Sequence, residues 1–401
     1  MAFFNEISLW EDGIYRLENT DRVKGYDATN NTMGMANKQA SQLANRTLYL
    51  KEKIMAVAGT VYGGNTPYLY AFGAAGKRKL LIREGVYSSE VILELDVPSI
   101  LDTGSLVGGK DYYVFRCPST SDHQVVYKVS LSKTYPQEHL LHGITLLGGF
   151  HTLCTNAGSS MSYVEGGVTK QHPLNGYVAG DILPMSVWCS NHRPYSEPEG
   201  MVYIPSLDFW CDIYLQSGSG ANTKSAYQGA ITRSRQYVDF VEDQFCVKKE
   251  LLDDGEFAAA MLGSNEQTNI ANSAFPSNGA GGHSDTTGRR MISIYGVEEG
   301  CGLLWQWLRT TSAAGLDGTI YGQTDDTPSY GYITMTQSSY GPYGQAGGKG
   351  SFYGLTLALR AGGAWYNGAD CGSRARAARY ARSRADSYSG GRGRSRPKRL
   401  I

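Results

Sequence analysis

The sequence predicts an α+β protein built mostly of β-strands and irregular loops. Three observations support this fold class. The 401 residues include 50 glycines and 28 tyrosines, a composition that favours strands and turns over helical bundles. Period-two alternation of apolar residues recurs along the chain, whereas helical periodicity is confined to short segments. We predict three parts, which are residues 1–54, 55–136 and 137–401.

The first part contains one helix signal. Small and apolar residues recur there in alternating steps of four and three, at Ala36, Ala40, Leu43, Thr47, Leu50 and Ile54. Such a seam, about two and a half heptads long, is of the coiled-coil type and needs oligomer contacts or docking to be stable. An amphipathic helix packed on its own domain explains the same pattern. Both interpretations remain open at this point.

The second part is predicted to be a small β-domain. Short runs rich in Val, Ile, Leu and Tyr are separated by Gly, Ser and Asp, as is typical of strands joined by turns. These runs are AVAGTVYGG, PYLYAFG, KRKLLIREGVY, SEVILELDV, KDYYVFRC and HQVVYKVSL.

The third part combines strands, long loops and two short helices. Strand-like segments such as GITLLGGFH, MVYIPSL and FWCDIYLQ are separated by Gly/Ser/Asn loops. Apolar periodicity predicts helices within residues 233–251 and 253–262. In the second helix, Asp253 and Asp254 occupy positions where N-caps and first-turn acids are preferred. Residues 347–365 are predicted to form a strand and a turn.

Charge and cysteine usage restrict the class of protein. The 37 basic residues balance the 37 acidic ones, yet residues 372–401 carry a net charge of +9 and the rest of the chain −9. This asymmetry makes contact with nucleic acid or an acidic surface one hypothesis. No apolar run of about 18 residues predicts membrane insertion, and the acidic N-terminus argues against a signal peptide. The seven scattered cysteines predict buried free thiols rather than disulfides or zinc ligands.

No catalytic motif in the sequence is complete. GSGANTKS at 218–225 is similar to a phosphate-binding loop, but Thr223 stands where the second glycine is required. His139 and His142 form an H-x-x-H pair with no third ligand nearby in sequence. Neither a G-x-S-x-G elbow nor a paired general acid and base is evident. We predict no catalytic residues, no metal and no cofactor, and leave calcium dependence open.

The stretch GGAWYNGADCGSRARAARYARSRADSYSGGRGRSRP, residues 362–397, is either a disordered basic tail or a folded surface. Trp365 follows two glycines in a position suited to burial, and the arginines lie within small-residue frames. Tyrosines are interleaved among them. Tyrosine supplies amphipathic contact area and arginine supplies planar hydrogen bonding, which together are typical of a binding surface. The pattern favours a folded surface.

The frame GG-x-W-x-N-G, followed by arginine-bearing segments, resembles the variable region of proteins diversified by retroelements. Other segments resemble members of this family in the same order: LLGGFH at 146–151, MVYIPSLDFWCDIYLQSG at 201–218, DDGEFAAAMLGSNE at 253–266, YGVEEGCGLLWQWL at 295–308 and GGKGSFYGLTLALRAGGAW at 347–365. The resemblance implies a C-type-lectin domain of the formylglycine-generating-enzyme branch over 137–401, with a variable region at about 362–396. GGKDYYVFRC at 108–117 is similar to the β-domain that precedes it.

The resemblance also implies a function. Family members in phages are non-enzymatic receptor-binding proteins of tail fibres that determine host tropism, so we expect a host cell-surface protein or glycan as partner. We expect location at the fibre tip of the virion and a homotrimer, which the seam at 36–54 also favours. VKGYDATNNTMGMANKQASQLANRTLYLKEK resembles the virion-anchoring segment of tail fibres, which implies contact with other tail or fibre proteins.

In this family a reverse transcriptase changes adenines in the codons of surface residues. The resemblance places the varied, ligand-binding residues at Tyr366, Asn367, Asp370, Ala377, Arg379, Tyr380, Arg384, Asp386 and Tyr388. A surface that accepts many side chains needs a fold that does not depend on them. We expect glycine turns, buried tryptophans and internally bonded arginines to supply that scaffold, at Gly362, Gly363, Trp365, Gly372, Arg374, Arg392, Trp305 and Trp307.

Two alternatives are retained. An oxidase of the formylglycine-generating type shares the fold branch, and it would need a reactive cysteine pair, for which Cys301 and Cys371 are the candidates. We expect Cys301 to lie in a buried strand, which disfavours this function. An arginine-rich nucleic-acid binder would use the basic residues between Arg394 and Arg399.

Overall fold

The computed structural model describes residues 67–83, 90–97, 100–118, 125–134, 144–314, 355–378, 380 and 382–398, with short segments at 26–27, 32–33, 43, 333–335 and 350–352. The chain divides into two compact units. The larger comprises Leu69–Ile82 with Val91–Lys398, and the other comprises Met1–Tyr68, Arg83–Glu90 and Arg399–Ile401. The predicted seam and anchor at 1–54 lie outside the described residues except for Leu43, which is helical, and an antiparallel pair of β1 (Tyr26–Asp27) and β2 (Thr32–Met33).

The strands predicted in the second part are present wherever the structure describes them. A three-stranded sheet has the order β3 (Leu69–Ala71), β4 (Lys79–Arg83) and β5 (Glu90–Glu94), with the 3-10 helix η1 at Gly73–Ala75. Leu80 and Ile82 alternate with less buried residues on β4, as expected for a strand with one face packed.

A second sheet crosses the predicted boundary at 136/137. Its order is β11 (Trp188–Cys189), β8 (Thr145–His151), β6 (Asp111–Pro118) and β7 (Val125–Ser130). The strand β8 pairs with both β6 and β11, because Gly148 and Gly149 let the neighbouring backbone approach closely. A Cβ on Gly148 would lie 2.0 Å from the carbonyl oxygen of Trp188. The domain boundaries themselves remain a prediction.

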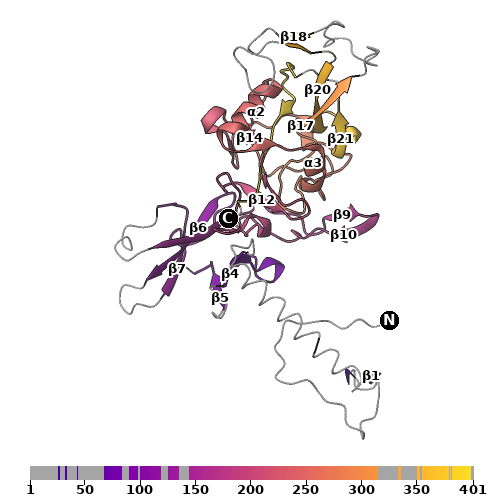
Figure 1. The fold of residues 1–401 in the computed structure, drawn as a ribbon. Coiled ribbons are helices and arrows are strands. Elements are labelled where there is room, and N and C mark those ends of the chain that lie inside the picture. Colours follow the sequence, from indigo (N-terminus) through magenta and orange to yellow (C-terminus); the bar gives the residue numbers. More distant parts are fainter. Residues whose placement is uncertain are drawn as a thin grey trace. The chain divides into compact units, whose positions relative to one another are not determined.

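Both predicted helices of the third part are present and capped. The first, α2, spans Tyr237–Cys246, and the second, α3, spans Asp254–Ala260. Asp253 is the N-cap of α3, as predicted, and its carboxylate accepts a hydrogen bond from the Glu256 N–H in a reciprocal capping box. Figure 1 shows both helices beside the sheet that contains β17, β20 and β21.

The C-terminal stretch contributes strands to two sheets. One has the order β12 (Met201–Ile204), β13 (Phe209–Asp212), β23 (Gly393–Ser395) and β16 (Glu250–Leu251). The other has the order β21 (Gly372–Ala377), β20 (Leu355–Gly362), β17 (Trp305–Ala314) and β22 (Ser389–Gly390). Arginine-rich segments are therefore paired strands, and β23 is an interior strand of its sheet.

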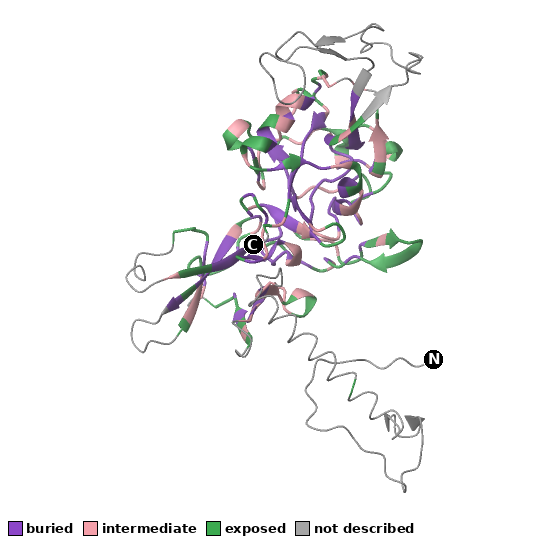
Figure 2. Ribbon diagram, viewed as in Figure 1, coloured by how far each residue is buried: buried purple, intermediate pink, exposed green. Residues whose placement is uncertain are grey.

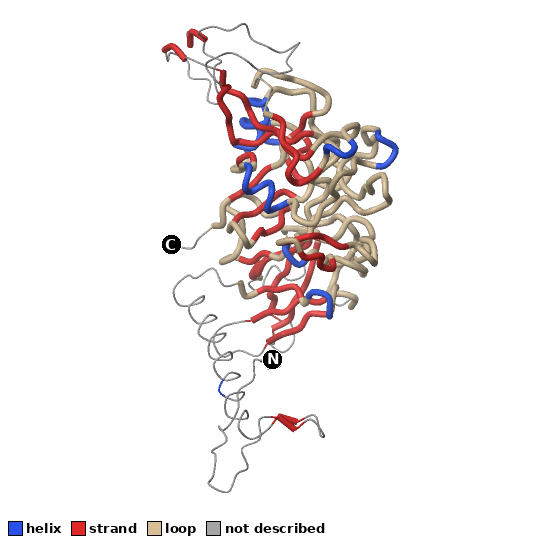
Figure 3. Tube along the Cα trace, turned by 90° about the vertical axis from the view of Figure 1, so that its right-hand side faces the viewer, coloured by secondary structure: helices blue, strands red, loops and turns tan. Residues whose placement is uncertain are grey.

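Short hairpins and 3-10 turns complete the described structure, and loops occupy much of the chain between them (Figure 3). The hairpins are β9 (Ser162–Glu165) with β10 (Val168–Gln171), β14 (Gln216–Ser217) with β15 (Lys224–Ser225), and β18 (Ile333–Met335) with β19 (Gly350–Phe352). The 3-10 turns are η3 (Pro184–Ser186), η4 (Gly220–Asn222), η5 (Ala271–Ser273) and η6 (Gly368–Asp370).

The core of the larger unit is continuous through the loops as well as the strands, as the buried segments in Figure 2 show. Trp210 and Trp307 are its largest fully buried side chains. Trp305 and Trp365, predicted to be core tryptophans, are only half-buried because each also borders the surface described below. All seven cysteines are free and six are buried, but Cys246 is exposed at the end of α2, contrary to the prediction. Among the described residues, no helix is long and apolar enough to cross a membrane.

Candidate functional site

A tight turn after β20 begins the candidate site. Gly362 and Gly363 both have positive φ angles, of +95° and +86°. A Cβ on Gly362 would lie 2.8 Å from the carbonyl oxygen of Gly300, and one on Gly363 would lie 2.7 Å from Cys371 Sγ. Only glycine satisfies both the backbone conformation and the space at these two positions, and their role as constant scaffold residues remains a prediction.

Hydrogen bonds fix the loop that follows, residues 364–367, to neighbouring segments and to itself. Trp365 N–H donates to the carbonyl of Leu303 at 3.0 Å, and Asn269 Nδ2 donates to the carbonyl of Trp365. The indole ring packs edge-on to Phe275 with 5.6 Å between ring centroids. Asn367 Oδ1 accepts from Ala364 N–H at 2.8 Å, so this predicted variable residue also closes the loop.

Aromatic rings from both ends of the 362–396 stretch meet over this loop. Tyr366 is exposed and lies edge-on to Trp365 and to Tyr388, with centroid distances of 5.4 and 5.6 Å. Edge-on arrangements of this kind are favourable for aromatic pairs. Burial raises the pKa of Tyr366 to about 12, so the hydroxyl is neutral and able to donate a hydrogen bond at physiological pH.

Arginines lie between these rings. The guanidinium of Arg360 lies 3.6 Å from the ring centroid of Tyr380 and 5.0 Å from that of Trp307. The guanidinium of Arg384 lies 5.2 Å from the Tyr380 ring, and its Nη2 donates to the Tyr388 hydroxyl at 2.5 Å. Cation–π contacts therefore organise the surface without long apolar side chains.

The predicted variable residues differ in burial. Two are exposed, Tyr366 and Asp370, and five are half-buried: Asn367, Ala377, Tyr380, Arg384 and Tyr388. Arg379 lies outside the described residues. Asp386 is buried, and its Oδ2 accepts from Arg360 Nη1 at 2.9 Å and Arg384 Nε at 3.1 Å. In this chain Asp386 therefore organises the site from within rather than facing a ligand.

The predicted scaffold arginines have different environments. Arg392 is fully buried, and its guanidinium donates to Gln306 Oε1 and to the carbonyls of Asp212, Ile213, Glu298 and Glu299. Arg374, by contrast, is exposed on β21, because its side chain lies on the face of the strand away from the core. Gly372 is buried, and a Cβ there would lie 2.1 Å from Glu266 Oε2.

Arginines of the basic stretch are also tied into the fold, among them Arg394 of the segment assigned to a nucleic-acid tail. Arg394 is buried on β23 and pairs with Glu250 at 2.8 Å and with Glu256 at 3.4 Å. Arg376 pairs with Asp254 at the start of α3. These ion pairs join the basic stretch to acids from distant parts of the chain, so these two arginines are not free to contact phosphates.

Sequence reasoning missed Arg360, Phe275 and Asn269. Phe275 and Asn269 come from the 269–275 loop, which no periodicity connects to residue 365. Arg360 did carry a signal, since it is a single charge within the apolar strand sequence LTLALRAG. An arginine at an inward position of such a strand has to be paired or stacked, and both occur here.

The cysteines of the oxidase alternative are unsuited to redox chemistry. Burial raises the pKa of Cys301 well above its ordinary value and that of Cys371 to about 12. A reactive cysteine needs the opposite shift. Cys301 lies in the loop before β17 rather than in the strand predicted for it. No group of three or more His, Cys, Asp or Glu side chains suited to a metal ion exists among the residues that the structure describes.

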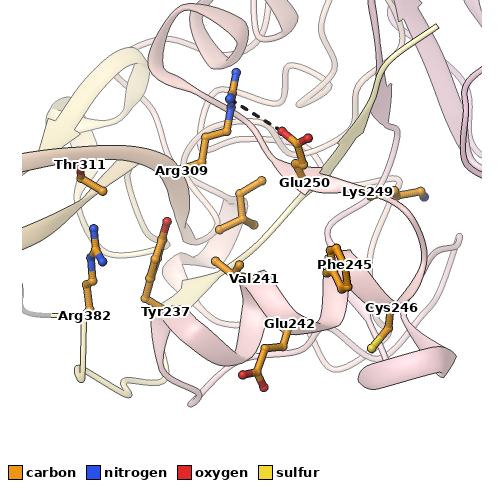
Figure 4. Close-up of a pocket in the computed structure, with 11 residues that line it drawn as sticks. Tyr237, Val241, Glu242, Phe245, Cys246, Lys249, Glu250, Arg309, Thr311 and Arg382 are labelled. Carbon is orange, nitrogen blue, oxygen red and sulfur yellow. Dashed lines mark ion pairs between the residues drawn. The ribbon is translucent and has the colours of Figure 1, made fainter. Parts of the chain in front are cut away.

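A pocket of about 630 Å³ is lined by residues of α2, β16 and β17 (Figure 4). Arg382 and Tyr237 stand side by side on one wall, with the guanidinium 5.3 Å from the ring centroid. The lining residues are Tyr237, Val241, Glu242, Phe245, Cys246, Lys249, Glu250, Leu251, Arg309, Thr311 and Arg382. Since none of them is a predicted variable residue, the pocket is separate from the aromatic surface.

Comparisons with known proteins match both the fold and the sequence of this chain. A family model described as the Mtd second domain matches residues 79–189. The tail fiber receptor-binding protein of Bordetella phage BPP-1 is 24% identical over 330 residues, which cover 76% of this chain and 76% of that protein. These matches confirm the resemblance to retroelement-diversified tropism determinants.

Solved structures of Major Tropism Determinant variants have the same fold. The U1 variant matches with a TM-score of 0.60 and 20% identity, covering 84% of this chain and 85% of that one. The P3c variant matches with a TM-score of 0.59 and 22% identity, covering 82% and 84%. The mostly β, C-type-lectin-like fold is thereby confirmed. The formylglycine-generating-enzyme branch and the N-terminal anchor remain predictions.

Proposed function

We propose that this chain is a non-enzymatic receptor-binding protein of a phage tail fibre, and that its aromatic surface binds a protein or glycan on the host cell. The receptor-binding role is that of the Bordetella phage relative by its name. The similarity over three quarters of both chains supports carrying this role over.

One observation carries the proposal further. Side chains at predicted variable positions from two separate segments, around residue 366 and between 380 and 388, meet in one aromatic cluster. The glycines at 362, 363 and 372 and the buried Arg392 hold the backbone around these segments through contacts that those side chains do not make. A surface with this division tolerates exchange of its outer side chains while the fold persists. Tyrosine-rich surfaces of this type bind diverse partners.

The finer features belong to the same proposal. We place the predicted variable residues other than the buried Asp386 at the receptor, the chain at the tip of the fibre, and residues 1–54 in contact with other virion proteins. A homotrimer would present three copies of the surface, so that weak single contacts add up to useful avidity.

Sequencing the 3′ end of the gene across a propagated phage population tests the proposal. Variation is expected at the nine named codons, with the codons of Trp365, Gly363 and Arg392 constant. A population in which these nine codons are as uniform as the rest of the gene contradicts diversification of this surface.

Adsorption to the host in competition with purified protein tests receptor binding directly. Tyr366→Ala and Tyr388→Ala are each expected to weaken competition by about tenfold or more, as for aromatic residues at the centre of an interface. Tyr195→Ala is the matched control, because Tyr195 is an exposed tyrosine outside the 362–396 stretch. Equal effects of all three substitutions would contradict the assignment of the binding surface.

A further inference from the structure

The pocket lined by α2, β16 and β17 has no part in the function proposed above. Its volume of about 630 Å³ is in the range of sites that bind small molecules. The helix α2 contributes Tyr237, Val241 and Phe245, which are spaced four residues apart and therefore share one face of the helix. These side chains give the pocket an apolar wall (Figure 4).

Three of the five charged side chains that line the pocket have ion-pair partners. Lys249 Nζ lies 2.5 Å from Asp212 Oδ1. Arg309 Nη1 lies 3.7 Å from Glu250 Oε2, and its Nη2 lies 2.8 Å from Asp253 Oδ2. These three charges are balanced by the protein itself. The remaining two, Arg382 and Glu242, have no ion pair among the described residues.

Arg382 presents hydrogen-bond donors to the pocket. Its guanidinium lies 5.3 Å from the ring centroid of Tyr237, and its backbone carbonyl accepts the Tyr237 N–H at 3.1 Å. Nε is buried, but Nη1 and Nη2 are accessible, and neither has a hydrogen-bond partner in the described part of the chain. Two adjacent N–H donors of one guanidinium match the two oxygens of a carboxylate, and such bidentate bonds are among the strongest in proteins.

The other groups of the pocket suit a sugar ring with hydroxyls. Phe245 is 73% exposed, so its ring is available to the apolar C–H face of a pyranose. Glu242 is exposed, and its carboxylate points away from Arg382 in Figure 4. Together with the Thr311 hydroxyl it supplies hydrogen-bonding groups for sugar hydroxyls.

An extended peptide is disfavoured as the occupant of this pocket. A peptide that adds a strand needs free backbone groups at the edge of a sheet. The strand β16 is at the edge of its sheet, but the segment that follows is already bonded to β17, because Arg309 N–H donates to the carbonyl of Leu252 at 2.9 Å. A sugar unit does not need such an edge.

We propose that this pocket binds an acidic sugar, with the sugar carboxylate on Arg382 and the ring against Phe245. Only the assignment of the sugar to a glycan of the host surface rests on the proposed function. Tyr237 packs edge-on to Trp307 at 5.8 Å, and Trp307 lies 5.0 Å from the guanidinium of Arg360, so packed side chains connect the pocket with the aromatic surface. Since no lining residue is a predicted variable position, the site would be shared by chains whose aromatic surfaces differ.

Ligand-observed NMR titration of the full chain tests the proposal. Glucuronate is the probe, and glucose, which has the same ring without the carboxylate, is the matched control. Glucuronate is expected to bind about tenfold more tightly than glucose, because a hydrogen bond to a charged group contributes that much. Arg382→Gln is expected to weaken glucuronate binding about tenfold, and Phe245→Ala about fivefold. Tyr195→Ala, at an exposed position outside the lining, is expected to have no effect.

Equal binding of the two sugars, or glucuronate binding that Arg382→Gln leaves unchanged, overturns the proposal. A glutamate-containing peptide that binds as tightly as glucuronate overturns the assignment to a sugar. Loss of glucuronate binding in Tyr366→Ala but not in Phe245→Ala would place the sugar on the aromatic surface and reject the pocket. If Arg382→Gln fails to fold, the comparison of the sugars and the exposed Phe245→Ala still decide.

Adsorption competition separates this inference from the proposed function. Competition weakened by Tyr366→Ala, without glucuronate binding, retains the proposed function and rejects the sugar site. Glucuronate binding, with competition unchanged by Tyr366→Ala, retains the sugar site and contradicts the aromatic surface as the receptor-binding site.

Discussion

At the scale of single residues, Arg392 shows how a charged side chain becomes part of a core. Its guanidinium is buried, and five acceptors from three separate segments satisfy it. Four of these acceptors are backbone carbonyls, those of Asp212, Ile213, Glu298 and Glu299. Burial of such a charge is tolerated only when its hydrogen bonds are complete.

Arg392→Lys is expected to destabilise the protein by about 3 kcal/mol, because one ammonium cannot reach all five acceptors and buried hydrogen bonds are lost without replacement. Arg374→Lys, on the exposed face of β21, is expected to change stability by less than about 0.5 kcal/mol. Urea unfolding of both variants measures the difference. Equal stabilities would mean that the Arg392 contacts contribute little.

His172 gives a prediction about pH. Burial lowers its pKa to about 4, and the charge of Arg289 acts in the same direction. The unfolded chain, with an ordinary histidine pKa near 6.5, therefore binds more protons between pH 6.5 and 4. Stability contributed by neutral His172 is complete above pH 6.5 and is lost as the pH falls towards 4, by about 3 kcal/mol.

The measurement is the free energy of unfolding of the parent chain minus that of His172→Asn across this range. Asparagine cannot titrate but can still accept the Leu174 N–H bond that His172 Nδ1 accepts at 3.2 Å. His283 does not disturb the comparison. Burial lowers its pKa, but the bond to Glu299 outweighs this and raises it, so its stabilisation is complete below pH 6.5 and is lost above. A difference independent of pH would contradict the prediction.

At the scale of elements, the turn after β20 depends on two separate properties of glycine. Gly363 and Gly288 have nearly the same φ, +86° and +82°, but only Gly363 has close neighbours. Gly288→Ala is expected to cost about 1 kcal/mol, from backbone strain alone. Gly363→Ala is expected to cost about 3 kcal/mol, because its Cβ would also meet Cys371 Sγ. Thermal or urea unfolding compares the two, and equal costs would show that the turn yields to the added methyl.

The elements that could be predicted from sequence are those with local signals. The cap at Asp253 and the apolar periodicity of 237–246 suffice to predict α3 and α2. The pairing of β23 with β13 and β16 could not be predicted, because strands of two or three residues carry no period. The burial of Asp386 could not be predicted either. It depends on the ion pair with Arg360, and neither segment alone carries a sequence signal for that contact.

At the scale of the whole molecule, part of the charge asymmetry is neutralised or enclosed within the fold. Residues 372–401 carry +9 and the rest −9, but Arg376, Arg384 and Arg394 pair with carboxylates, and Arg392 is enclosed by carbonyls. Composition indicated a nucleic-acid tail as one hypothesis because counting charges does not reveal their partners. The small-residue frames around the arginines were the better guide, since they favoured a folded surface over a solvated block of charge.

The final prediction distinguishes a structural role of the C-terminal basic stretch from a role in binding nucleic acid. A chain ending at Gly390 lacks β23, an interior strand, and the Arg392 contacts, so it is expected to lose cooperative unfolding of the larger unit. Reversing the exposed charges with Arg396→Glu and Lys398→Glu is expected to leave the unfolding midpoint nearly unchanged. Neither the parent chain nor this double variant is expected to retain duplex DNA at moderate salt, as measured by fluorescence anisotropy. A phosphate-binding tail requires the reverse pattern: the truncated chain would unfold cooperatively, and the parent alone would bind DNA, more weakly as salt is added.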